Sequence, residues 1–319
     1  MKKIVGTVIT VCIVLLLIAL CIVFRGADFD ENQISTLKIL LIICGCSAAY
    51  CFVTGEITKN YSQMDKLWSI LPIAYLWIIA AKGGFDLRLS VYALIVTAWG
   101  IRLTVNFARK GAYRLKFWEG NEDYRWSIVK NHPVFSKGFA WTLFDLFFIS
   151  IYQNALVLAI CLPAVACMGS ANSFGTIDII AAGLAVAFFV LETVSDEYQW
   201  QFHQQKKKLL EKGKTLDEIP LPYSLGFNTL GPWSRMRHPN YLGEQGIWLS
   251  LYIFAIGSGA AQNGIFNITF IGPLLLILLF IGSSTLGEKI SSQKYTQYKS
   301  YINQVCKYIP IKKFDPCKQ

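Results

Sequence analysis

The stretch IFNITFIGPLLLILLFIGSSTL, residues 265–286, contains no charged residue, and neither does IVGTVITVCIVLLLIALCIVF, residues 4–24. Apolar runs of 18 residues or more are typical of helices that cross a lipid bilayer. Of the 319 residues, 54% are hydrophobic and 16% are charged, whereas soluble domains average about 25% charged residues. These stretches predict an integral membrane protein, and they argue against a soluble enzyme, a secreted disulfide scaffold and a nucleic-acid-binding protein.

Hydropathy along the rest of the chain predicts further spans and an all-α fold, a polytopic membrane bundle of seven to eight transmembrane helices. The expected spans are 4–24, 34–54, 67–81, 89–108, 139–162, 174–194, 242–261 and 265–286. We expect a single membrane domain over 1–319, in which 1–33 form an N-terminal anchor helix and 34–319 a bundle with cytoplasmic loops 109–138 and 197–240. The span 67–81 is short and broken by Pro72, so we expect it to tilt, kink or lie partly in the membrane interface.

Basic residues predict the orientation of these spans. The N-terminus, the tail from 287 and the segments 55–66, 109–137 and 197–240 together hold 25 of the 30 Lys and Arg residues. Short loops rich in Lys and Arg stay in the cytoplasm. Both termini are therefore expected to be cytoplasmic.

Cysteine and histidine patterns do not indicate a disulfide framework or a structural metal site. The nine cysteines include no Cys-x-x-Cys pair, and the three histidines are scattered. Most of the cysteines lie in or beside apolar stretches, where we expect small, reduced, buried side chains.

Ionisable residues inside or beside membrane spans are costly, so they are candidate functional residues. Seven of them fall in the predicted cytoplasmic half, which indicates a polar cavity open to the cytoplasm. Each one alone also fits a capping or snorkelling residue. They are Glu56, Arg102, Asp145, Glu192, Asp196, Glu244 and Glu288.

A polar stripe follows the sixth predicted span. Its members recur at i, i+3, i+4, i+7 and i+11, the spacing of one helical face. Such a stripe is suited to binding the hydroxyl and amide groups of a nucleotide, although a solvated helix face has the same pattern. The members are Glu192, Ser195, Asp196, Gln199 and His203.

The segment NTLGPWSRMRHPNYLGE, residues 228–244, has the features of a phosphate-binding loop. Arg235, Arg237 and His238 offer positive charge, and Pro239 is expected to begin a helix whose backbone N–H groups favour anions. Binding of lipid headgroups explains the arginines equally well. It does not explain Asn240 and Glu244, which follow at helical spacing.

Several motifs in combination resemble the steroid 5-alpha reductase family, specifically its bacterial branch, over about residues 50–315. They are RHPNYLGE (237–244), Glu192-x-x-x-Asp196, DKLWS (65–69) with Pro72, WGIRL (99–103), and Tyr295-x-x-Tyr298 with Ile309-Pro310. The resemblance implies NADPH-dependent reduction of a carbon–carbon double bond conjugated to a ketone. It implies a steroid-like or isoprenoid-like substrate from the bilayer, and a site facing the cytoplasm at the bacterial inner (plasma) membrane.

The resemblance also implies roles for individual residues. Glu56 matches the glutamate that binds the substrate ketone, Trp99 stands near the position of a family tyrosine, and Arg102 is the alternative donor. Glu192 replaces a common asparagine. Because Lys59 is the nearest basic residue in sequence, we expect Glu56 not to form a structural ion pair, with helix capping as the alternative. The expected cofactor-binding residues are Glu192, Ser195, Asp196, His203, Arg235, Arg237, His238, Asn240, Tyr241, Glu244 and Tyr295.

Two other functions fit parts of the pattern. A membrane methyltransferase of the isoprenylcysteine carboxyl type, which uses S-adenosylmethionine, has a similar Arg-His-Pro loop and Tyr-x-x-Tyr tail, but its paired carboxylates are reduced here to Glu288. A non-enzymatic lipid-binding protein is the third possibility. The expected partners are a lipophilic small molecule and membrane lipids, without nucleic acid or metal.

Overall fold

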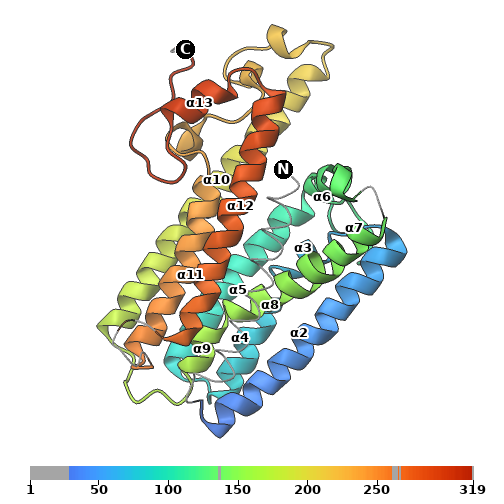
Figure 1. The fold of residues 1–319 in the computed structure, drawn as a ribbon. Helices are drawn as coiled ribbons and strands as arrows, with labels where there is room; N and C mark the ends of the chain where they lie inside the picture. The colour runs from blue at the N-terminus through green and yellow to red at the C-terminus, as the bar shows by residue number, and fades with distance from the viewer. Residues whose placement is uncertain (1–28, 136–137, 261–264, 266, 318–319) are drawn as a thin grey trace. The chain divides into compact units, whose positions relative to one another are not determined.

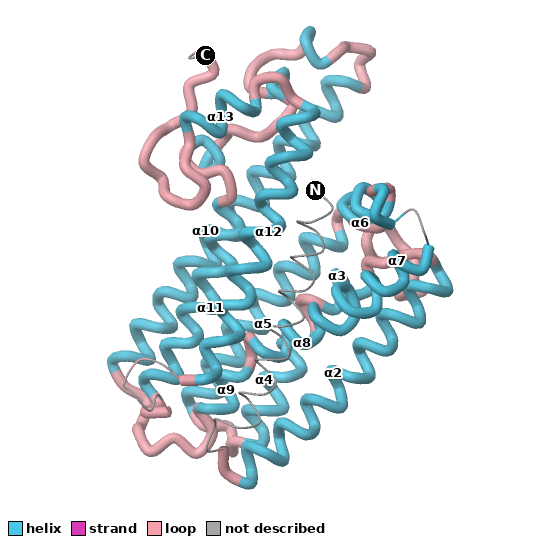
Figure 2. Tube along the Cα trace, viewed as in Figure 1, coloured by secondary structure: helices cyan, strands magenta, loops and turns pink. Residues whose placement is uncertain are grey.

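The computed structural model describes residues 29–135, 138–260, 265 and 267–317. All regular secondary structure in these residues is helical (Figures 1 and 2). The predicted all-α fold is therefore confirmed for this part of the chain. The expected anchor helix at 4–24 lies outside the described residues.

The chain divides into two compact units, which are described separately: unit 1 comprises residues 1–182 and 250–275, and unit 2 comprises 183–249 and 276–319. Unit 1 contains α2 (Glu31–Thr58), α3 (Gln63–Leu67), α4 (Leu71–Lys82), α5 (Leu87–Ala108), α6 (Tyr124–Lys130), α7 (Gly138–Phe144), the π-helix η2 (Asp145–Tyr152), α8 (Gln153–Ala159) and α9 (Leu162–Ala166). Unit 2 contains α13 (Tyr298–Gln304) and the larger parts of α10 (Thr176–Leu210) and α12 (Ile271–Lys294), with the first half of α11 (Pro239–Gly257). Short 3-10 helices lie at Pro133–Phe135, Leu216–Glu218, Tyr223–Leu225, Gly231–Ser234 and Ile268–Phe270.

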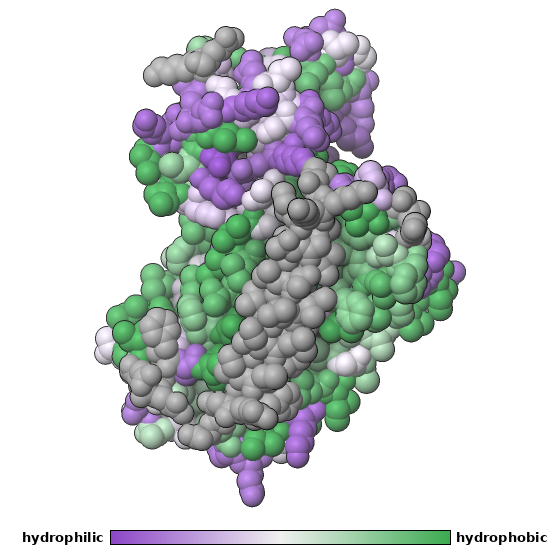
Figure 3. All heavy atoms as spheres, viewed as in Figure 1, coloured by the Kyte–Doolittle hydropathy of each residue, from purple (hydrophilic) through white to green (hydrophobic). Residues whose placement is uncertain are grey.

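Among the residues that the structure describes, five helical segments are long and apolar enough to cross a membrane, so the chain is an integral membrane protein. They are Glu31–Thr58, Leu87–Ala108, Gly138–Ala166, Thr176–Leu210 and Ile268–Lys294. Within unit 2, hydrophilic side chains gather over α13 and the end of α10 (Figure 3). The count of seven to eight spans and the cytoplasmic termini remain predictions.

Two expected spans differ in detail from the helices that form. Pro72 does not break α4, because it lies in the first turn, where its missing N–H has no helical partner to lose. The expected span 139–162 is interrupted: an eight-residue π-helix follows α7, and the chain turns after α8 before α9 begins at Leu162, with Pro163 in its first turn. π-helical segments within α-helices are rare and occur often at functional sites.

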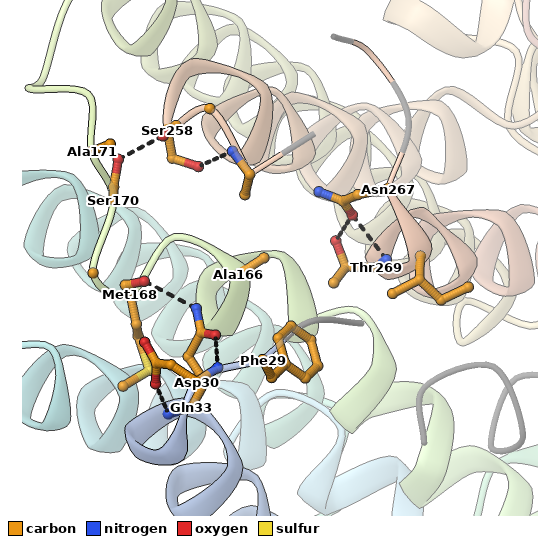
Figure 4. Close-up of a pocket in the computed structure, with 14 residues that line it drawn as sticks. Phe29, Asp30, Gln33, Ala166, Met168, Ser170, Ala171, Ser258, Asn267 and Thr269 are labelled. Carbon is orange, nitrogen blue, oxygen red and sulfur yellow. Dashed lines mark hydrogen bonds between the residues drawn. The ribbon is translucent and has the colours of Figure 1, made fainter. Parts of the chain in front are cut away.

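The start of α2 is fixed to the end of α9 within unit 1. Asp30 and Gln33 form a capping box, in which the Asp30 carboxylate accepts from the Gln33 N–H at 2.7 Å. The Gln33 side chain then donates to the carbonyls of Val165 and Met168. Figure 4 shows Asp30, Gln33 and Met168 of this contact at one side of a cavity.

The cysteine expectation is confirmed for Cys44, Cys51, Cys161 and Cys167, which are free and buried. It is wrong for Cys46, which is free but exposed. Cys12 and Cys21 lie outside the described residues.

Candidate functional site

The predicted stripe and the predicted loop meet in unit 2. Because α10 runs unbroken from 176 to 210, the stripe does lie on one helix. Glu192 is 2% exposed and Ser195 is fully buried. Asn240, in the first turn of α11, donates from Nδ2 to Oδ1 of Asp196 at 3.2 Å. Residues 44 positions apart thus form one polar cluster.

The close approach of α10 and α11 requires a glycine. A Cβ placed on Gly243 would lie 2.6 Å from the Cβ of Glu192, which is far inside van der Waals contact. The absence of a side chain at 243 therefore lets Asn240 reach Asp196. Glu244, one residue further, is also buried.

The carboxamide oxygen of Asn240 lacks a hydrogen-bond donor among the described residues. Oδ1 of Asn240 is buried and accepts no hydrogen bond from the described residues, while the other side of its carboxamide is held by Asp196. An unpaired buried acceptor costs about 1–3 kcal/mol. A ligand that brings a donor to this acceptor recovers that cost.

Arg237 and His238 are both bound to Glu288 of α12. The Arg237 Nε and the His238 Nε2 each lie 2.9 Å from Oε1 of Glu288. Arg237 also donates to the carbonyls of Ile302 and Val305, beyond the α12 end. The Arg237 guanidinium therefore joins α11 to the tail, whereas Arg235 is exposed.

The remaining predicted cofactor residues make other contacts within unit 2. Tyr241 stacks on His238, with ring centroids 5.2 Å apart. Tyr295 lies 5.7 Å from the ammonium of Lys206, measured to the ring centroid. His203 interacts with Gln199, one turn earlier in α10, at 3.1 Å.

The loop before α11 is held on two sides. Trp233 donates from Nε1 to the Ser195 carbonyl at 2.8 Å, which ties the loop to α10. The Tyr301 hydroxyl of α13 donates to the Met236 carbonyl at 3.1 Å, and burial raises the pKa of this phenol. Gly231 has a φ of 56° and lies against the Tyr198 ring, where a side chain would collide. These contacts fix the position of the loop and therefore of Asn240, which follows it.

The expected catalytic residues lie in unit 1. Glu56, in the last turn of α2, accepts from the Lys59 Nζ at 3.0 Å and from the Thr142 Oγ1 at 3.3 Å. The expectation that Glu56 lacks an ion pair is therefore wrong. Lys59 is the C-cap of α2 and adopts the left-handed conformation, with a φ of 57°. Its side chain reaches Glu56, three residues earlier, within ion-pair distance. The pair is partly exposed, so it contributes little to stability.

Trp99 and Arg102 are neighbours on α5, at i and i+3. Trp99 is fully buried, and Arg102 is partly buried. Their spacing places both side chains on one face of the helix.

Asp145 begins the π-helix and had no role assigned from the sequence. Its side chain is 1% exposed, and its Oδ1 accepts from the Ser150 Oγ at 3.4 Å. Its Oδ2 is buried without a hydrogen bond from the described residues and faces Gly55, beside Glu56. The π-helical geometry has no sequence signal that would have indicated this placement.

The sequence also gave no indication of the Arg88–Asp178 ion pair of unit 1. The Arg88 guanidinium lies 2.6 Å from Oδ1 of Asp178 and also donates to the Ser170 hydroxyl. Ser170 in turn donates to the Ser258 carbonyl, at the wall of a cavity of about 310 Å³ (Figure 4). None of the predicted site residues lines this cavity.

No group of three or more His, Cys, Asp or Glu side chains is placed to hold a metal ion among the residues that the structure describes. The candidate site of unit 2 is thus built from carboxylates, carboxamides and basic groups. These groups suit a polar organic ligand with amide, hydroxyl or phosphate functions.

The fold and this site define a helical integral membrane protein with a buried polar cluster between two of its helices. The chain belongs to the family described as "Protein of unknown function (DUF1295)", which matches residues 51–305. It is similar to an uncharacterized protein of Schizosaccharomyces pombe, with 36% identity over 264 residues that cover 79% of this chain and 73% of the relative. No solved structure matches the chain significantly.

Proposed function

We propose that this protein is an NADPH-dependent membrane oxidoreductase that acts on CH–CH groups and reduces a carbon–carbon double bond conjugated to a ketone. The substrate is lipophilic, steroid-like or isoprenoid-like, and enters from the bilayer. NADPH enters from the cytoplasm, which places the proposed site on the cytoplasmic side of the bacterial inner membrane. The motif resemblance to the steroid 5-alpha reductase family supports the chemistry, which the matched family description leaves open.

The observation that carries the proposal is the Asp196–Asn240 contact with its unpaired acceptor. The Asn240 Oδ1 needs a donor, and the dinucleotide offers amide and hydroxyl donors. Asp196 and Asn240 would hold these groups, and the exposed Arg235 would pair with a phosphate. The residues present therefore fit NADPH, which would supply a hydride when bound.

The residues of unit 1 supply the other half of the proposed chemistry. Negative charge develops on the ketone oxygen during reduction, and a donor aimed at that oxygen lowers the barrier. Glu56 is the proposed donor, held by Thr142 and Lys59. Arg102 is the alternative donor, and Trp99 is the proposed contact in place of the family tyrosine.

Thermal unfolding of the detergent-solubilised protein with NADPH tests the cofactor. A ligand that binds only the folded state at 100 times its Kd adds about 2.7 kcal/mol to the free energy of unfolding. Asn240→Ala and Asp196→Ala should each lose most of this shift. Asn303→Ala, an exposed carboxamide of the same unit, should keep it.

The alternatives make different predictions in the same assay. The methyltransferase stays the second candidate, because the Arg237–Glu288–His238 cluster joins the loop and tail that the two classes share. A shift with S-adenosylmethionine and none with NADPH would replace the reductase by that function. A shift with neither compound favours the lipid-binding protein.

A further inference from the structure

Two buried aspartates of unit 1 have contrasting surroundings. Asp145 and Asp178 are each 1% exposed. Asp178 receives two hydrogen bonds from the guanidinium of Arg88, at 2.6 and 3.0 Å. Asp145 receives one, from a neutral hydroxyl at 3.4 Å, and its second oxygen receives none from the described residues. A carboxylate buried without a cation is costly, and it usually neutralises.

The two lysines that act electrostatically on Asp145 bind other groups. Lys59, at the end of α2, lies on Glu56. Lys130, at the end of α6, lies 4.7 Å from the ring centroid of Tyr61 and 3.4 Å from its hydroxyl. Glu56 is close enough to act on Asp145 electrostatically, and it would repel a second negative charge there. Asp145 thus has Glu56 as an acidic neighbour, while Lys59 binds Glu56 and Lys130 binds Tyr61.

We propose that Asp145 is kept as a neutral carboxylic acid and stores the proton that reloads Glu56. A proton needs no cavity, so it can occupy the enclosed Oδ2 where a larger ligand cannot. The protonation state stands on the geometry alone, whereas the reloading role rests on the proposed function.

The step balances in atoms and charge. Reduction of one conjugated double bond takes up one hydride, which NADPH supplies, and one proton. Asp145 passes its O–H proton to the Glu56 carboxylate, and Glu56 delivers this proton to the enolate oxygen of the substrate. The resulting enol then returns to the ketone with that proton on the α-carbon. Asp145 then takes a proton from water and returns to the acid. Asp145 is in this scheme a positioning and storage residue that acts through Glu56.

Infrared difference spectroscopy of the purified full-length protein tests the protonation state. A buried carboxylic acid has a C=O stretching band that an ionised carboxylate lacks, and this band shifts in D₂O. Asp145→Asn at neutral pH should remove one such band. Asp178→Asn is the matched control, and it should remove a carboxylate band instead. In Glu56→Gln the Asp145 band should persist at neutral pH. On raising the pH it should disappear at a lower pH than in wild type, because the neighbouring negative charge is gone.

Loss of a carboxylate band in Asp145→Asn would overturn the proposal. If that variant does not fold, Ser150→Ala provides the same test, because it removes the hydroxyl that hydrogen-bonds to Asp145. Its acid band should move, and an unchanged band would overturn the proposal. These spectra need no nucleotide, so the NADPH thermal shift can fail while the Asp145 assignment stands, and the reverse also holds.

Discussion

Arg88 and Asp178 form a buried, two-point ion pair in unit 1. The Nε and Nη2 atoms of Arg88 lie 2.6 and 3.0 Å from the two carboxylate oxygens of Asp178. Arg88 also donates to the carbonyls of Asn172 and Ser173, so its guanidinium connects the start of α5 to the loop before α10. Both ends of this pair lie close to the beginning of a membrane helix.

Removing one partner of the pair should be strongly destabilising. Arg88→Met leaves the buried Asp178 charge without a partner, and such changes cost about 3–5 kcal/mol. Thermal unfolding in detergent measures this effect. The double variant Arg88→Met/Asp178→Leu should be more stable than Arg88→Met alone, and equal stability of the two would contradict this account of the pair.

Substitution at Gly243 should separate α10 from α11. In Gly243→Ala the new methyl group meets Glu192, and overpacking of this kind costs about 1–3 kcal/mol. The NADPH-induced thermal shift should fall as well, because Asn240 lies on the same turn. Gly45→Ala in α2 is the control: no atom lies within 4 Å of the added carbon, and helix propensity predicts a gain of up to about 1 kcal/mol. An undiminished NADPH shift in Gly243→Ala would argue against the role of this contact.

Because of Lys66, the free energy of unfolding of the protein should increase as the pH is raised into the alkaline range. Its fully buried Nζ donates to the Phe117 and Glu119 carbonyls, and burial lowers its pKa from 10.5 to about 8. The unfolded chain therefore binds the proton more tightly, so the free energy of unfolding should rise between about pH 8 and 10.5, by on the order of 2–3 kcal/mol. A neutral amine still has two N–H donors, so both hydrogen bonds survive.

Thermal unfolding from pH 7 to 10 measures this effect. Lys66→Met should lack that rise, whereas the exposed Lys116→Met should keep it. Parallel pH curves for wild type and Lys66→Met would show that Lys66 titrates normally.

Kinetics should distinguish the catalytic role of Glu56 from the effect of its ion pair with Lys59. Glu56→Gln removes the proposed donor to the ketone oxygen, and loss of one such donor costs about a hundredfold or more in kcat. Lys59→Met removes the ion pair but leaves the donor, and should cost far less. NADPH oxidation dependent on a steroid 4-en-3-one measures both, with the NADPH thermal shift retained in each variant. Near-normal turnover in Glu56→Gln would assign Glu56 to structure and shift the proposal to Arg102.

The positive-inside pattern predicts which loops face the cytoplasm. The loop 167–175 contains no Lys or Arg, while 109–137 contains seven. An impermeant thiol reagent added to intact cells should label Ser173→Cys and not Lys116→Cys, with wild type as the control for native cysteines. Both positions are exposed, so the reverse pattern would place the candidate site on the other side of the membrane.

The sequence alone predicts features of single helices, because these features depend on local backbone geometry and on whether side chains avoid water. Long apolar runs exclude water whatever their neighbours are, so the membrane helices followed from hydropathy. The stripe from Glu192 to His203 followed from the period of the α-helix, and α10 is indeed continuous there. The stripe and the loop 228–244 each predict part of a nucleotide site, because each has its own local pattern of polar residues.

The tertiary structure decided which of these features touch. Asn240 meets Asp196 because Gly243 lets two helices approach, and no local pattern encodes that distance. The sequence predicts Arg237 as a phosphate ligand, yet Glu288 and the tail carbonyls hold it. Asp145 and Asp178 look alike as single acidic residues near span ends, but packing gives Asp178 a cation and leaves one Asp145 oxygen unpaired. Charge pairing and desolvation depend on atoms distant in sequence, so their outcome is set only when the helices pack.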